Sequence, residues 1–144
     1  TKNCVCGPGQ IYKYQKKISG PLLDRIDLHV EVPRLPYEKM VGTSPSESSE
    51  NIKKRVEAAR RIQKRRFGNS KTNNEMSLVE IKEYCKLNES EQQLLKQAMK
   101  QYNFSGRSLH RILKVARTIA DLAQADSIQL KHLAEAIQYR PKTE

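Results

Sequence analysis

The chain has 144 residues, with 27 Lys and Arg against 16 Asp and Glu, and its net charge of +11 favours polyanionic partners such as nucleic acids or nucleotides. We expect neither a membrane span nor a secretory leader, because no run approaches the ~20 apolar residues of a membrane helix and the first residues have no apolar core. Three cysteines are too few for a disulfide framework, which predicts a reducing compartment and a cytoplasmic protein.

The glycines exclude several nucleotide-binding and hydrolase motifs. None of the six begins a G-x-x-x-x-G-K-[ST] loop or a G-x-G-x-x-G fingerprint, and the chain has neither G-x-S-x-G nor H-E-x-x-H. The chain therefore cannot be a self-sufficient NTPase or hydrolase of those kinds. Since its first residue, Thr1, is also not an initiator Met, we expect a piece of a longer protein.

Residues 1–41 are predicted to be strand- and turn-like. A turn at 18–21 is followed by residues 22–25, which can form one helical turn. In residues 26–32, Ile, Leu and Val alternate with Asp, His and Glu, which predicts a short strand that ends at Pro33. No clear second strand follows, so this strand must pair with upstream sequence or pack on helices.

The second part of the chain is predicted to be helical. Residues 42–50 are small, polar and broken by a proline, which is typical of a linker, and residues 51–144 follow as a helical domain. Apolar spacing predicts helices at about 47–67, 77–84, 88–99, 105–123 and 127–139, with Gly68 ending the first. Ser77, Asn88 and Ser105 are expected N-caps. The expected fold is mainly α, a bundle of four to five helices preceded by a short strand-like arm.

The first long helix carries a basic face opposite its apolar stripe. Six cations form two neighbouring columns on it, namely Lys53, Arg60 and Lys64, and Lys54, Arg61 and Arg65. Such a face can follow the phosphates of DNA with an affinity that depends on salt and not on base sequence. The alternative is a solvated surface, softened by an ion pair between Glu57 and Arg61.

Cys4 and Cys6 form a C-x-C-G turn that can offer two thiolates to one Zn²⁺ ion, whereas tetrahedral zinc needs four ligands. The pair can therefore supply half of a zinc site whose other half lies upstream, and we expect no zinc site closed within the chain. Cys85 is expected to pack as a small hydrophobic residue.

Two long segments carry a family resemblance. They are residues 17–33, K-I-S-G-P-L-L-D-R-I-D-L-H-V-E-V-P, and residues 107–122, R-S-L-H-R-I-L-K-V-A-R-T-I-A-D-L. The first resembles a signature segment of the magnesium-chelatase-like AAA+ proteins, and the second resembles their C-terminal helix. The Cys4-x-Cys6 pair and the Tyr84-Cys85-x-Leu87 turn also fit, and the closest subgroup is the ComM/YifB type. The match spans nearly the whole chain.

The resemblance implies that residues 1–41 are the end of an AAA+ core and that the helices form its C-terminal lid. The parent would be a hexameric ATPase that binds ATP and Mg²⁺ through a P-loop upstream of Thr1. Its lid would contact its own core and the neighbouring subunits of a homo-hexamer.

By the same resemblance, Arg25 falls where related ATPases carry the arginine finger, and Arg107 where they carry the sensor-2 arginine of the lid. A finger in trans neutralises charge that develops on a neighbour's γ-phosphate, and the start of a helix favours anions near Arg107. From the residues alone, Arg25 can equally pair with the flanking Asp24 and Asp27, and Arg107 can form a surface salt bridge.

Two activities remain open within the family. ComM-type members are associated with DNA branch migration, a helicase-like activity, during natural transformation, whereas the chelatases proper drive Mg²⁺ insertion into protoporphyrin. The C-x-C pair and the amino-acid sequence of residues 17–33 favour the ComM type, although the upstream cysteines that would complete a four-thiolate set are absent here. Alternatives from other classes are an autonomous basic module that binds nucleic acid and a structural oligomerisation module.

Overall fold

The computed structural model describes residues 5–34 and 47–140, and every regular element in them is helical. The N-terminal part holds α1 (Pro8–Gln15) and α2 (Gly20–Leu23). The second part holds α4 (Ser49–Phe67), the 3-10 helix η1 (Asn73–Glu75), α5 (Leu78–Tyr84), α6 (Glu89–Gln101), α7 (Gly106–Leu122) and α8 (Leu130–Gln138). The prediction of a mainly α fold is confirmed. None of the helices in these residues has the length and apolar character that a bilayer span requires.

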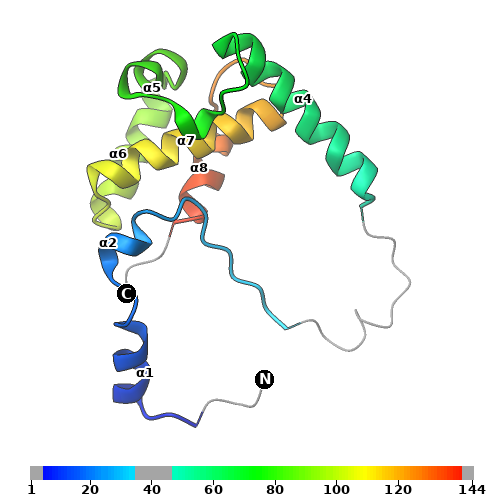
Figure 1. The fold of residues 1–144 in the computed structure, drawn as a ribbon. Coiled ribbons are helices and arrows are strands. Elements are labelled where there is room, and N and C mark those ends of the chain that lie inside the picture. Colours follow the sequence, from blue (N-terminus) through cyan, green and yellow to red (C-terminus); the bar gives the residue numbers. More distant parts are fainter. Residues whose placement is uncertain (1–4, 35–46, 141–144) are drawn as a thin grey trace.

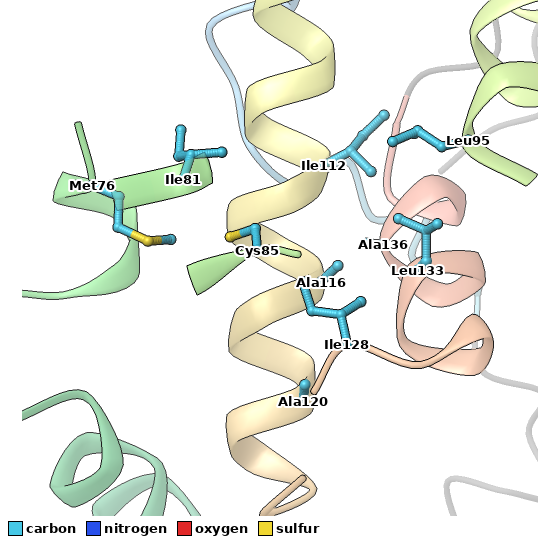
Figure 2. Packing of buried hydrophobic residues seen from close by; sticks show 10 residues of the cluster. All are labelled: Met76, Ile81, Cys85, Leu95, Ile112, Ala116, Ala120, Ile128, Leu133 and Ala136. Carbon is cyan, nitrogen blue, oxygen red and sulfur yellow. The ribbon is translucent and has the colours of Figure 1, made fainter. Parts of the chain in front are cut away.

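Helix α7 is the centre of the bundle, because α4, η1, α5 and α8 all pack on it, while α6 packs on α8 (Figure 1). Three residues one turn apart on α7, Ile112, Ala116 and Ala120, are completely buried. Figure 2 shows Met76 and Ile81 on one side of α7 and Leu95, Leu133 and Ala136 on the other. Because the two alanine side chains are small, helices on both sides can pack closely against α7.

The predicted N-caps at Ser77 and Ser105 and the predicted end of α4 at Gly68 are confirmed. The Ser77 Oγ accepts from the Glu80 N–H at 3.3 Å, and a Glu80 carboxylate oxygen accepts from the Ser77 N–H at 2.6 Å, which completes a capping box. A hydrogen bond from Lys71, together with those from Ser77, lowers the pKa of Glu80 to about 2. Gly68 ends α4 in the left-handed conformation, at φ 71°, where a side chain would be strained.

The strand predicted at 26–32 is wrong, because no strand forms in residues 5–34 and 47–140. Among these residues, the one backbone hydrogen bond between this segment and a distant element runs from the His29 N–H to the Tyr139 carbonyl, at 2.8 Å. Val30 and Val32 remain 65% and 85% exposed. An alternating pattern makes a segment extended, but a strand also needs a neighbouring edge to pair with.

Two further boundaries differ from the prediction. Helix α1 was not predicted, although Gly7 at its N-cap and Pro8 in its first turn are typical helix-start signals. The last helix begins at Leu130 and not at Ser127, since Ile128 is buried in the core from an extended stretch before it. Of the predicted linker, residues 42–46 lie outside the described residues, and α4 already begins at Ser49.

A buried carboxylate joins α4 and η1 to α7. Asp121 is 0% exposed, and its two oxygens accept from Arg66 of α4, from Arg117 of α7 and from the Asn73 side chain of η1. Asn73 also accepts from Arg66 at 2.8 Å, which closes the network. Buried charges are tolerated only when paired and hydrogen-bonded, and here both conditions hold.

We expect Asp121→Asn to lower the free energy of unfolding by about 3 kcal/mol or more, because Arg66 and Arg117 would lose their shared counter-charge in a dry site. Urea denaturation followed by circular dichroism measures this change. Asp126→Asn is the matched control at an exposed aspartate, with an expected effect within about 0.5 kcal/mol. Equal stability of the two variants would contradict the role of Asp121.

His132 makes the stability of the bundle sensitive to pH. It is 2% exposed, its Nδ1 accepts from the Gln129 N–H at 3.1 Å, and its Nε2 has no partner among the described residues. Burial, with help from the nearby Lys131 and Arg117 charges, lowers the pKa of His132 below its ordinary 6.5. As the pH falls, His132 is therefore protonated in the unfolded chain at a higher pH than in the folded chain. The folded state is fully stable above the ordinary pKa of 6.5 and loses stability as the pH falls below that value.

His132→Gln keeps an acceptor for the Gln129 N–H and removes the titration. We expect the loss of unfolding free energy between about pH 7.5 and about pH 5.5 to be smaller in this variant than in the wild type, as measured by urea denaturation. The values at the higher pH, where His132 is neutral, serve as the internal control. The same loss in both proteins would contradict this account.

Candidate functional site

The segment after α2 is fixed to the bundle at a cluster of polar contacts that we call the arm junction. It joins Asp24, Ile26 and Asp27 to the first turns of α7 and to Arg140, the residue after the C-cap of α8. Figure 1 shows this segment passing from α2 along the end of the bundle near α8. The junction therefore connects the N-terminal part of the chain to the helix at the centre of the core.

Asp24 is the anchor of the arm junction. Its carboxylate accepts from the hydroxyls of Ser105 at 2.9 Å and Ser108 at 2.8 Å, at the start of α7, where the helix dipole favours an anion. Ser105 is also the N-cap of α7, since its Oγ accepts from the Ser108 N–H at 3.1 Å. The Ser108 hydrogen bond, followed by Ser105, Arg140 and Arg107, lowers the pKa of Asp24 against the opposing effect of burial.

Two arginines complete the junction from the bundle side. Arg140, 4% exposed, donates to the Ile26 carbonyl at 2.7 Å, to Asp24 at 3.2 Å and to the Ser108 hydroxyl at 3.1 Å. Arg111 of α7 forms an ion pair with Asp27. Both aspartates that flank Arg25 are thus engaged by groups of the bundle.

The two arginines singled out by the resemblance lie on this junction, and both are exposed. Arg25 is the second residue after the end of α2 and has no ion pair or hydrogen-bonded side chain in the described part of the chain, so the alternative pairing with Asp24 or Asp27 is not found. Arg107 lies in the first turn of α7, between Gly106 and Ser108, and likewise forms no salt bridge with a described residue. Its charge nevertheless acts on Asp24.

The six predicted cations of α4 have different surroundings. Lys53 and Lys54 form exposed ion pairs with Glu57 at 3.8 Å and Glu50 at 2.7 Å, so the expected pair of Glu57 with Arg61 is wrong. Arg60 donates to the Gln63 side chain and to the Ser70 carbonyl, both at 3.1 Å. The remaining three have no partner within residues 5–34 and 47–140, and we call them the basic face: Arg61, Lys64 and Arg65.

The basic face surrounds an open surface hollow of about 720 Å³ at the C-terminal end of α4, together with Ala58, Ile62, Gly68 and Gln124. Arg61 and Lys64 also line a second hollow beside Asn69 and Ser70. Unpaired cations around a concave, open surface can accept a polyanion without first breaking an ion pair.

Two family models cover the chain. The model for the C-terminal part of magnesium chelatase subunit ChlI matches residues 46–140, and the model for magnesium chelatase subunit ChlI matches residues 1–40. The chain belongs to the magnesium chelatase ChlI family. The resemblance inferred from residues 17–33 and 107–122 is thereby confirmed.

Curated relatives agree with this assignment. The chelatase-family chain is 43% identical to competence protein ComM of Haemophilus influenzae over 134 residues, which are 92% of this chain and 26% of that protein. It is 42% identical to YifB of Escherichia coli over 94% of this chain and 26% of that protein, and 30% identical to Mb2921c of Mycobacterium bovis over 96% of this chain and 28% of that protein. The chain thus spans about a quarter of the length of these relatives.

The cysteines of this chelatase-family chain lie in two settings. Cys6 is exposed and Cys4 lies outside the described residues, so the half-site for Zn²⁺ stays a prediction. Within residues 5–34 and 47–140, no three His, Cys, Asp or Glu side chains are grouped to hold a metal ion. Cys85 is buried, as expected, and burial raises the pKa of its thiol to about 11.

The groups that organise the junction were not predicted from the sequence. Asp24 and Asp27 were considered only as alternative partners of Arg25, whereas the groups that bind them lie more than eighty residues away. The serines at 105 and 108 were available as signals, since a hydroxyl at the N-cap and another three residues later can both serve an incoming anion. Nothing in the sequence indicates Arg140, because the contact depends on where α8 ends.

Proposed function

We propose that this chain is the C-terminal, nucleotide-sensing lid portion of a cytoplasmic hexameric AAA+ ATPase that acts on DNA. The division expected from the sequence, with a core end at 1–41, a linker at 42–50 and a lid at 51–144, is part of this proposal. ATP and Mg²⁺ would be bound by the rest of the parent protein, and the partners of the lid would be its own core and neighbouring subunits. Family membership and two ChlI-type relatives, ComM and YifB, support the proposal.

The observation that carries the nucleotide-sensing role is the pair of unpaired, exposed arginines at one anchored junction. Arg25 and Arg107 are each adjacent to a residue held by Arg140, and neither has a counter-charge bound in the described residues. A guanidinium without a partner can bind phosphate oxygens with both nitrogens and loses no ion pair in doing so. The family resemblance of residues 17–33 and 107–122 implies the arginine finger at Arg25 and the sensor-2 role at Arg107, and their lack of partners supports these two roles.

The observation that favours DNA over a metal-insertion substrate is the basic face. Arg61, Lys64 and Arg65 lie toward the C-terminal end of α4 without partners among the described residues, and they line an open surface hollow of about 720 Å³. Branch migration in natural transformation, the activity associated with ComM-type proteins, requires contact with DNA of any sequence. A face that reads charge and not bases fits that requirement.

We expect Arg25→Ala in the full-length ATPase to lower kcat for ATP hydrolysis by about 10³-fold, because the charge on the transferred phosphoryl group would no longer be neutralised in trans. Mixing this variant with a subunit that has a defective P-loop but an intact Arg25 should restore part of the activity.

We expect Arg107→Ala to raise KM for ATP by about tenfold, since a charged hydrogen bond to the nucleotide is lost. Arg34→Ala, at an exposed arginine of the same arm, is the control. Activity of Arg25→Ala equal to this control, or an absence of rescue, would contradict the assignment.

The basic face is tested by two triple variants of α4 that remove the same charge. We expect Arg61→Gln, Lys64→Gln and Arg65→Gln together to weaken binding of a labelled DNA duplex by this chain and to reduce the slope of log affinity against log salt by about 2 to 3. The matched control neutralises Lys53, Lys54 and Arg55, which already form ion pairs within their own helix or with Glu47. Fluorescence anisotropy across a salt series measures both. An equal loss in the two variants would show that net charge alone matters.

A further inference from the structure

Arg140, the residue after the C-cap of α8, binds acceptors from two distant parts of the chain. It is 4% exposed, and both terminal nitrogens of its guanidinium are used. One donates to the Ile26 carbonyl at 2.7 Å, and the other donates to Asp24 at 3.2 Å and to the Ser108 hydroxyl at 3.1 Å. These three acceptors come from two parts of the chain that are more than eighty residues apart.

The acceptors of Arg140 are chain neighbours of the two exposed arginines of the junction, Arg25 and Arg107. Asp24 and Ile26 are the two chain neighbours of Arg25, and Ser108 is the next residue after Arg107. A single buried guanidinium therefore binds on both sides of one exposed arginine and directly beside the other. Because a planar guanidinium holds its acceptors in fixed directions, the backbone of residues 24–26 is oriented relative to the first turn of α7.

Two other contacts hold the same segment but do not reach the start of α7. Arg111 pairs with Asp27 one helical turn further along α7, and the His29 N–H donates to the Tyr139 carbonyl next to Arg140. They keep the segment near the bundle, whereas the contacts from Arg140, Ser105 and Ser108 orient residues 24–26 relative to the start of α7. Loss of Arg140 should thus loosen Arg25 without releasing the whole arm.

We propose that Arg140 is a positioning residue that holds Arg25 and Arg107 in one rigid unit. Through this unit, a shift of α7 or α8 carries Arg25 with it, so that the lid and the finger move together. This inference rests on the proposed function for its catalytic consequence, but its geometric part concerns only the described residues and can be tested separately.

The geometric test measures the distance between spin labels at Arg25→Cys and Arg107→Cys in this chain by pulsed electron paramagnetic resonance. Cys4 and Cys6 are replaced by serine, and the buried Cys85, whose thiol has a pKa of about 11, stays unmodified. We expect a narrow distribution with Arg140, a broader one with Arg140→Lys, which keeps the charge but not the planar fork, and the broadest with Arg140→Met. Tyr139→Phe, which removes only the exposed hydroxyl contact to Glu135, is the control. Equal widths in the folded Arg140 variants and the control would overturn the proposal.

The catalytic test uses the full-length hexamer. We expect Arg140→Met to lower kcat for ATP hydrolysis by at least tenfold while the oligomer remains assembled, and Arg140→Lys to have an intermediate kcat. Mixing with a P-loop-defective subunit that carries an intact Arg140 should restore activity, which a merely unfolded lid would not allow. A broadened distance distribution with unchanged kcat would overturn the finger assignment of Arg25 and leave the geometric role of Arg140 intact. An unchanged distribution would overturn the role of Arg140 whatever the kcat.

Discussion

The buried carboxylate of Asp121 determines how this bundle is assembled. Apolar packing alone would hold α4 weakly, since Ala59 is the one apolar residue of α4 that is buried in the described chain and Ile62 is only half-buried. The hydrogen bonds from Arg66 and Asn73 to Asp121 add the fixed attachment that this packing lacks. By drawing Arg66 inward, they also decide which cations of α4 remain on the outside. The basic face exists in its observed form because one neighbouring arginine is committed to the core.

Helix α7 carries a bound carboxylate at each end, and the two ends differ physically. At its N-terminus the helix dipole favours the negative charge of Asp24, so two hydroxyls and one arginine suffice to hold it. Asp121 lies one residue before the C-terminal end, where the dipole disfavours an anion and water is excluded. Two guanidiniums and an amide are present there, which is the compensation that such a site requires.

The same helix links these anchors to the exposed groups. Arg107 lies in its first turn beside Ser108, which binds Asp24, Arg111 pairs with Asp27 one turn later, and Asp121 fixes α4 at the far end. The junction and the basic face are thus attached to opposite ends of one rigid element. Under the proposed function, a displacement of α7 on nucleotide binding would move both the arginine pair and the DNA-contacting surface.

Local features of the sequence were predictable where they depend on neighbours in the chain. The caps at Ser77 and Ser105 and the stop at Gly68 follow from hydrogen bonds and backbone strain within a few residues, and the structure has all three. The sequence predicts one apolar stripe along the whole of α4, and its burial is confirmed only toward the C-terminal end of the helix. Its C-terminal residues are packed, whereas Ile52 and Val56 are 42% and 45% exposed, because α4 extends past the bundle at that end (Figure 1).

The sequence by itself determined the helical class, the N-caps at Ser77 and Ser105, the end of α4 at Gly68 and the family. The tertiary structure alone decided that residues 26–32 are extended without forming a strand, that Arg66 faces inward, and that Asp24 is bound by Ser108 and Arg140. The physical reason is the range of the interactions. Caps and periodicity act over three to four residues, whereas the partner of a charged side chain is chosen by the fold from everything that comes within hydrogen-bonding distance.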